Sequence, residues 1–75
     1  PAADLLQLVG ELDRLDLPPG RAAEVRDSLL ALAGAVADGP PPWELVSEAL
    51  ARSGASPALA RRVLPLLLEL IARAA

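Results

Sequence analysis

The sequence predicts a single all-α domain that folds as a compact four-helix bundle made of two αα-hairpins. Three observations support this fold class. Apolar residues recur with a helical period of about 3.6, clusters of Pro and Gly divide the chain into four segments, and no segment contains a run of β-branched residues. A chain of 75 residues has room for one domain, so we assign residues 1–75 to it. The expected helices span about 3–15, 19–37, 42–53 and 57–74.

The first two segments each carry one apolar arc of the width typical of a half-buried helix. Within residues 3–15, Gly10 lies on the flank of this arc, where we expect a neighbouring helix to approach closely. Residues 19–37 begin with Pro in the first turn, and Gly39 is expected to terminate that helix. The expected core residues of these two helices are Leu5, Leu8, Val9, Leu12, Leu15, Ala22, Val25, Leu29, Leu32, Ala33 and Val36.

The third segment, residues 42–53, is the shortest. Glu48 and Arg52 are four residues apart in the favoured order for an ion pair on a helix surface. Gly54 is expected to end the helix. The residues expected to face inward are Trp43, Val46, Ala49 and Leu50.

The fourth segment, residues 57–74, has the strongest start signal, because Ser56 suits the N-cap and Pro57 the first helical position. Its polar stripe spans only about 120° and includes Pro65, so we expect a kink there rather than a break. The remaining arc of about 240° is apolar. It contains Leu59, Val63, Leu64, Leu66, Leu67, Leu68, Leu70 and Ile71.

The two halves of the chain resemble each other. A shift of 38 residues superimposes Pro19 on Pro57 and Val25 on Val63. The same shift places the three leucines at 29, 30 and 32 on those at 67, 68 and 70. Two similar hairpins that cover each other's apolar surfaces explain this near-repeat.

Composition excludes most kinds of chemistry. The chain lacks Cys, His and Lys, so we expect no metal site, no cofactor, no catalytic residue and no enzymatic activity. The net charge of −3 and the absence of a basic stripe argue against nucleic-acid binding. The most apolar run, Val63 to Ile71, is too short to span a membrane, and no signal peptide is apparent. We therefore expect a soluble protein of intracellular type.

Two features could mediate contacts with a partner. Trp43, the one aromatic residue, is either a binding hot spot or a core anchor packed on Pro40 to Pro42, and we favour the core. The wide apolar arc at 57–74 either makes that helix the centre of the bundle, which we favour, or forms a surface for self-association or for a protein or peptide partner. The candidate surface residues are Leu64, Leu68, Ile71 and Trp43.

A third feature is the stretch of small residues that includes Ala31, Ala33, Gly34, Ala35 and Ala37. Such residues usually permit close helix packing. Alternatively, they could line a cavity for a small apolar ligand in the bundle core.

The segments Leu17 to Val25 and Ser56 to Leu64 are idealised helix starts followed by Ala, Leu and Arg. In this respect the chain resembles computationally designed helical miniproteins. The resemblance implies a non-catalytic helical scaffold, which is our leading functional hypothesis. The absence of Lys departs from the usual designed surface, and a natural protein from a GC-rich genome would share the same composition. No natural family is recognised.

Overall fold

Four α-helices and one short 3₁₀ turn form the part of the chain that this computed structural model describes, residues 2–54 and 56–74. No strand occurs in that part. The molecule measures 33 × 18 × 18 Å. The all-α prediction is confirmed. The elements are α1 (Ala2–Glu11), η1 (Leu12–Arg14), α2 (Pro19–Ala37), α3 (Trp43–Ser53) and α4 (Pro57–Ala74).

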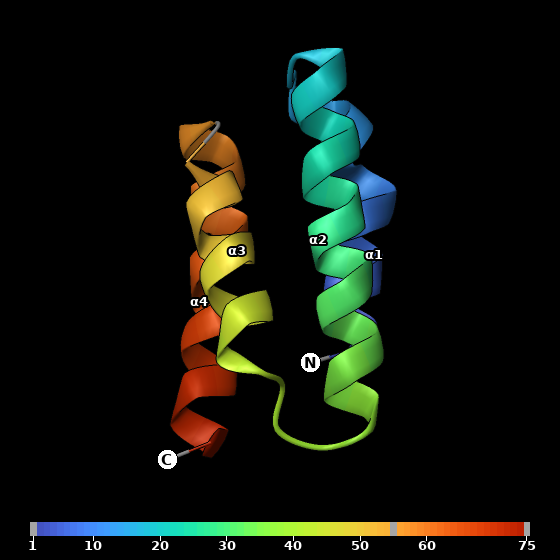
Figure 1. Cartoon of the computed structure of the whole chain (residues 1–75). Coiled ribbons are helices and arrows are strands. Elements are labelled where there is room, and N and C mark those ends of the chain that lie inside the picture. The colour runs from blue at the N-terminus through green and yellow to red at the C-terminus, as the bar shows by residue number, and fades with distance from the viewer. Residues whose placement is uncertain (1, 55, 75) are drawn as a thin grey trace.

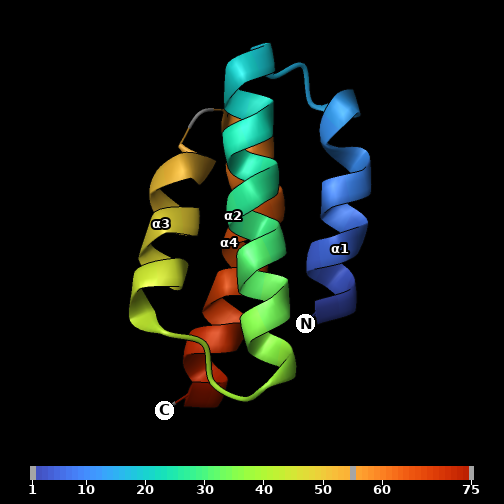
Figure 2. The ribbon, with the colours of Figure 1, turned by 45° about the vertical axis from the view of Figure 1, so that its right-hand side comes forward.

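The helices form a ring in which each one packs against two others. α2 packs against α1 and α3, α4 packs against α3, and a less extensive contact between α4 and α1 closes the ring. Figure 1 shows the two hairpins, α1 with α2 and α3 with α4, side by side. In Figure 2, α2 lies in front of α4, between α1 and α3. This is the four-helix bundle of two αα-hairpins that the sequence predicts.

The end of the first helix differs from the prediction. The α-helix stops at Glu11 rather than near Leu15, and η1 continues the chain with a tighter turn that is common at helix ends. The amide of Leu15 donates to the carbonyl oxygen of Leu12 at 3.1 Å. Asp16 follows with φ 54°, a conformation that Asp tolerates better than most residues. This left-handed residue turns the chain toward Pro18.

The other helix ends follow the local signals in the sequence. Gly39 adopts φ 127°, which favours glycine, directly after α2. The third helix begins at Trp43, with Pro42 in an extended conformation before it. At the start of α4, the Ser56 Oγ accepts a hydrogen bond from the amide of Leu59 at 3.3 Å, which confirms the predicted N-cap. α4 continues through the exposed Pro65 without a break.

The core lies along the middle of the ring and is almost entirely aliphatic. The residues that the near-repeat superimposes behave alike, since Val25 and Val63 are both buried. At Gly10, by contrast, an added Cβ would meet no atom within 4 Å, so the expected close approach of a neighbouring helix is wrong. The buried apolar residues are Leu5, Leu8, Leu12, Val25, Leu29, Leu32, Ala33, Val46, Ala49, Leu59, Val63, Leu67 and Leu70.

Candidate functional site

Five large apolar side chains of α3 and α4 are exposed to solvent. We call this set the α3–α4 face. The exposed fractions are 63% for Trp43, 43% for Leu50, 39% for Leu64, 63% for Leu68 and 42% for Ile71.

Helix periodicity explains why these side chains share a face. On α4, Leu64, Leu68 and Ile71 follow the i, i+4, i+7 spacing that aligns residues along one side of a helix. On α3, Trp43 and Leu50 are seven residues apart and are aligned in the same way. The two helices run in opposite directions, so the start of α3 meets the end of α4 (Figure 1).

A shallow hollow joins the two rows of side chains. It has a volume of about 190 Å³. A second hollow of about 240 Å³ extends from it toward the loop after α2 and shares Pro41 and Leu70. The first hollow is lined by Pro41, Trp43, Val46, Leu70 and Ile71.

The α3–α4 face overturns two favoured interpretations of the sequence, and the expectation that Leu50 faces inward is wrong as well. Trp43 is not a core anchor, although Pro41 does lie beside it in the hollow. α4 is not the centre of the bundle either, because the other helices leave Leu64, Leu68 and Ile71 exposed. In a ring of four helices, each helix needs only a stripe of about 100° or slightly more to fill the core. An apolar arc of about 240° therefore has a part that the core does not use.

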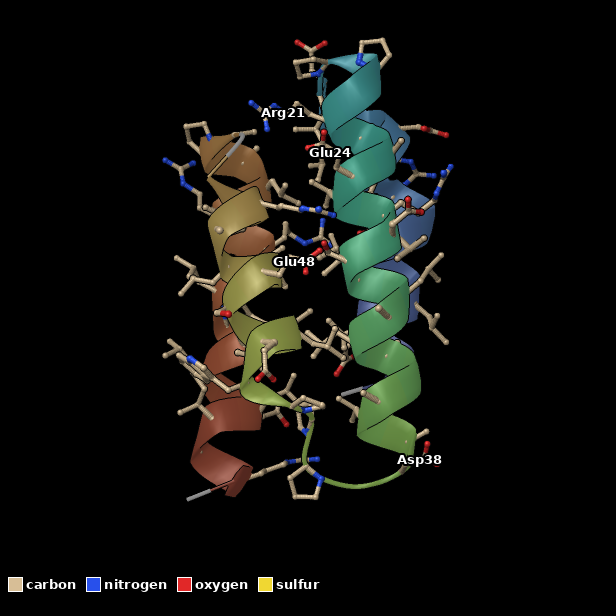
Figure 3. All side chains as sticks on the ribbon, viewed as in Figure 1. Arg21, Glu24, Asp38 and Glu48 are labelled. Atoms are coloured by element: carbon tan, nitrogen blue, oxygen red, sulfur yellow. The ribbon has the colours of Figure 1, made fainter. Side chains whose placement is uncertain are left out.

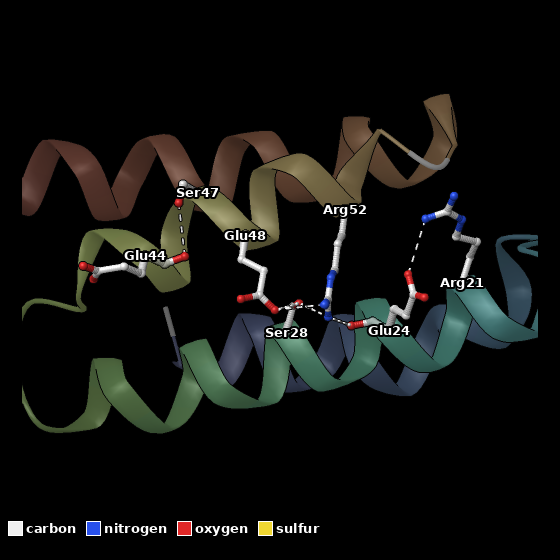
Figure 4. Close-up of polar contacts among 7 residues, drawn as sticks. All are labelled: Arg21, Glu24, Ser28, Glu44, Ser47, Glu48 and Arg52. Carbon is white, nitrogen blue, oxygen red and sulfur yellow. Dashed lines mark hydrogen bonds and ion pairs between the residues drawn. The ribbon is translucent and has the colours of Figure 1, made fainter.

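A polar cluster lies between α2 and α3, where Figure 3 shows Glu24 and Glu48 on facing helices. Arg52 Nη1 donates to the Glu24 carbonyl oxygen at 2.9 Å and to the Ser28 Oγ at 2.8 Å. Arg52 Nη2 pairs with Glu48 Oε1 at 3.1 Å, and the Ser28 hydroxyl donates to the same oxygen at 3.3 Å (Figure 4). The predicted Glu48–Arg52 ion pair is present, but the reach of Arg52 across to α2 was not predicted.

This cluster is structural in character. Ser28 is only 5% exposed, and its hydroxyl both accepts and donates a hydrogen bond. Such a satisfied network fixes the register of two helices. On the other side of the bundle, Arg62 of α4 pairs with Glu11 of α1. The two hairpins meet at two helix pairs, α2 with α3 and α1 with α4. At each pair, an arginine of the second hairpin binds a residue of the first.

The remaining candidate features give no further site. The carboxylates of Asp13, Asp16, Glu44 and Glu48 are all exposed, so none has the burial that shifts a catalytic carboxylate. Across residues 2–54 and 56–74, no group of three or more acidic side chains is placed to hold a metal ion. No helix in the same part of the chain is long and apolar enough to cross a membrane.

The small residues Ala31, Ala33, Gly34, Ala35 and Ala37 line neither of the two apolar hollows described above. An added Cβ at Gly34 would meet no atom within 4 Å. This glycine therefore does not mark a close helix contact.

Comparisons of the chain with protein-family models, with curated proteins and with solved structures find no match. The functional argument therefore rests on the geometry of the α3–α4 face.

Proposed function

We propose that this chain is a non-catalytic module that binds a protein or peptide partner through the α3–α4 face. The observation that carries the proposal is the exposure of Trp43 beside the apolar row of α4. Trp is among the residues most enriched at the energetic centres of protein interfaces. Trp43 also borders a hollow that an apolar side chain of a partner could fill.

The size of the surface supports the same function. A fully exposed Leu or Ile has about 180 Å² and a Trp about 250 Å² of surface. The exposed fractions then give the α3–α4 face about 500 Å² of apolar area. This value lies near the upper end of the range for the largest patch on a typical monomer, and such patches are often functional.

The alternative functions have less support. An idealised scaffold without a partner fits the strong helix signals, but its surface is expected to be charged and free of apolar patches. A ligand in the bundle core requires a site of roughly 300 Å³ or more. The apolar hollow beside Trp43 is smaller than this. The larger hollows, of about 520 and 390 Å³, are open to the surface and lined partly by charged side chains, Arg21, Glu24 and Arg52 in one and Asp13 and Arg26 in the other.

Selection from a library of helical peptides with randomised surface positions tests the proposal. We expect immobilised wild-type protein to enrich peptides that carry an apolar face with i, i+3 and i+7 anchors. Leu68→Glu should abolish their binding, because it places a charge in the α3–α4 face. Leu30→Glu is the matched control, since Leu30 is the equivalent exposed residue of the other hairpin. Peptides that bind Leu68→Glu as well as wild type would contradict the proposal.

Glutamate variants of the three α4 residues in the α3–α4 face show whether the face is free surface. Leu64→Glu, Leu68→Glu and Ile71→Glu should each leave helicity, measured by circular dichroism, unchanged. A loss of helicity in all three would place these side chains in the core and would also contradict the proposal.

A further inference from the structure

We propose that the partner of the α3–α4 face is a second copy of this chain, bound as a two-fold symmetric dimer. The inference rests on the proposed function and names the occupant of the same face. Three properties of the face support it: its area, its shape and the charges beside it.

The area fits a small, reversible dimer. About 500 Å² of apolar surface is roughly a ninth of the 4508 Å² that the described chain exposes. A standard interface buries about 800 Å² on each partner, or about a tenth of the surface of a small protein. The apolar centre thus supplies more than half of that area, and the polar residues around it would supply the rest. An interface of this size belongs with weak, reversible associations, whose affinity the area alone does not determine.

The shape is self-complementary. In a two-fold interface, each chain must offer both a projection and the recess that receives it. Leu68 is the most exposed leucine of the described chain and provides the projection. The hollow of about 190 Å³ beside Trp43 provides the recess. Both features belong to the same face, as a two-fold interface requires.

The charges beside the face match under a two-fold axis near its middle. Glu44 lies next to Trp43 at the start of α3, and Arg61 lies on the first turns of α4. Trp43 shares its hollow with Leu70, and Arg61 precedes Leu70 by nine residues, or about 14 Å along the helix axis.

Glu44 and Arg61 thus flank opposite ends of the face with opposite charge. Both are exposed, and neither forms an ion pair with another residue of the part of the chain that the structure describes. A two-fold axis that exchanges the two ends brings Glu44 of each copy to Arg61 of the other.

Sedimentation equilibrium over about 1 µM to 1 mM protein tests the dimer. We expect wild type and Leu30→Glu to pass from monomer to dimer within this range. Leu68→Glu should raise the dissociation constant at least tenfold. Glu44→Arg and Arg61→Glu should each raise it several-fold, and the double variant Glu44→Arg/Arg61→Glu should restore it to within about threefold of wild type.

Two outcomes would overturn the inference. One is a wild-type chain that stays monomeric at 1 mM. The other is a dimer that Leu68→Glu leaves intact, because its contact would lie elsewhere. After either outcome, the peptide selection still tests the proposed function, because it uses immobilised protein and depends only on whether the α3–α4 face binds a partner. Failure of the second-copy inference is thereby distinguished from failure of the proposed function.

Discussion

Leu67 and Leu68 are neighbours in the sequence with opposite environments, so they give a sharp test of the packing. Leu67 is 2% exposed in the core, whereas Leu68 is mostly exposed on the α3–α4 face. Truncating a buried leucine to Ala costs about 2–5 kcal/mol, and we expect about 3 kcal/mol for Leu67→Ala. A chain of this length has a total stability of about 4–11 kcal/mol, so the loss is a large fraction. The melting temperature should fall by about 15 °C.

Leu68→Ala should change the free energy of unfolding by less than about 1 kcal/mol, because roughly a third of the side chain is buried. Urea denaturation followed by circular dichroism measures both variants. A protein concentration of about 1 µM or less keeps the proposed association from adding to the apparent stability. Equal losses for the two variants would refute the assignment of Leu68 to the surface, and so would a larger loss for Leu68→Ala.

Three further predictions can be checked by the same unfolding assay. Gly39→Ala should destabilise the fold by about 1–2 kcal/mol because of the positive φ at this position. Gly34 lies inside α2 with open space where a Cβ would be, so Gly34→Ala should instead stabilise the fold by about 0.5–1 kcal/mol. If both glycine variants changed the free energy of unfolding in the same direction, the end of α2 between these two residues would be contradicted. Arg52→Ala should lower the free energy of unfolding by about 1–2 kcal/mol, because it removes the hydrogen bonds to Ser28 and Glu24. Arg73→Ala removes only an exposed ion pair and should lower it by less than about 0.5 kcal/mol. Ser56→Ala should cost about 1 kcal/mol through loss of the N-cap at α4, and an unchanged midpoint would show that the cap does not stabilise the helix.

The helices were predictable because local signals mark nearly every boundary. Pro57 follows an N-cap serine, and Gly39 follows the last apolar position of α2, so neither end depends on distant contacts. The end of α1 was less predictable. The tightening into η1 depends on the positive φ of Asp16, and Asp adopts that conformation only in suitable surroundings.

The α3–α4 face was only partly predictable. Periodicity places Leu64, Leu68 and Ile71 together, but it cannot tell whether a neighbouring helix covers them, because that depends on the packing of the whole ring. The size and apolar character of Trp43 favour a place in the core. It is the first residue of α3, and the structure leaves 63% of it exposed.

One residue of the sequence signals the polar cluster. Ser28 lies three residues after Val25 and four before Leu32, on the same arc as these core residues. A hydroxyl at such a position requires a polar partner from a neighbouring helix. Arg52 provides it.

Fluorescence of Trp43 tests the central claim most directly, because it is the one tryptophan of the chain. We predict that in dilute solution the indole emits at long wavelength and is readily quenched by acrylamide. At high protein concentration its emission should shift to shorter wavelength and its quenching should decrease, as the α3–α4 face becomes covered. Leu68→Glu should retain the dilute-solution behaviour throughout. An indole that is protected at every concentration, in wild type and in Leu68→Glu alike, would place Trp43 in the core and contradict the claim.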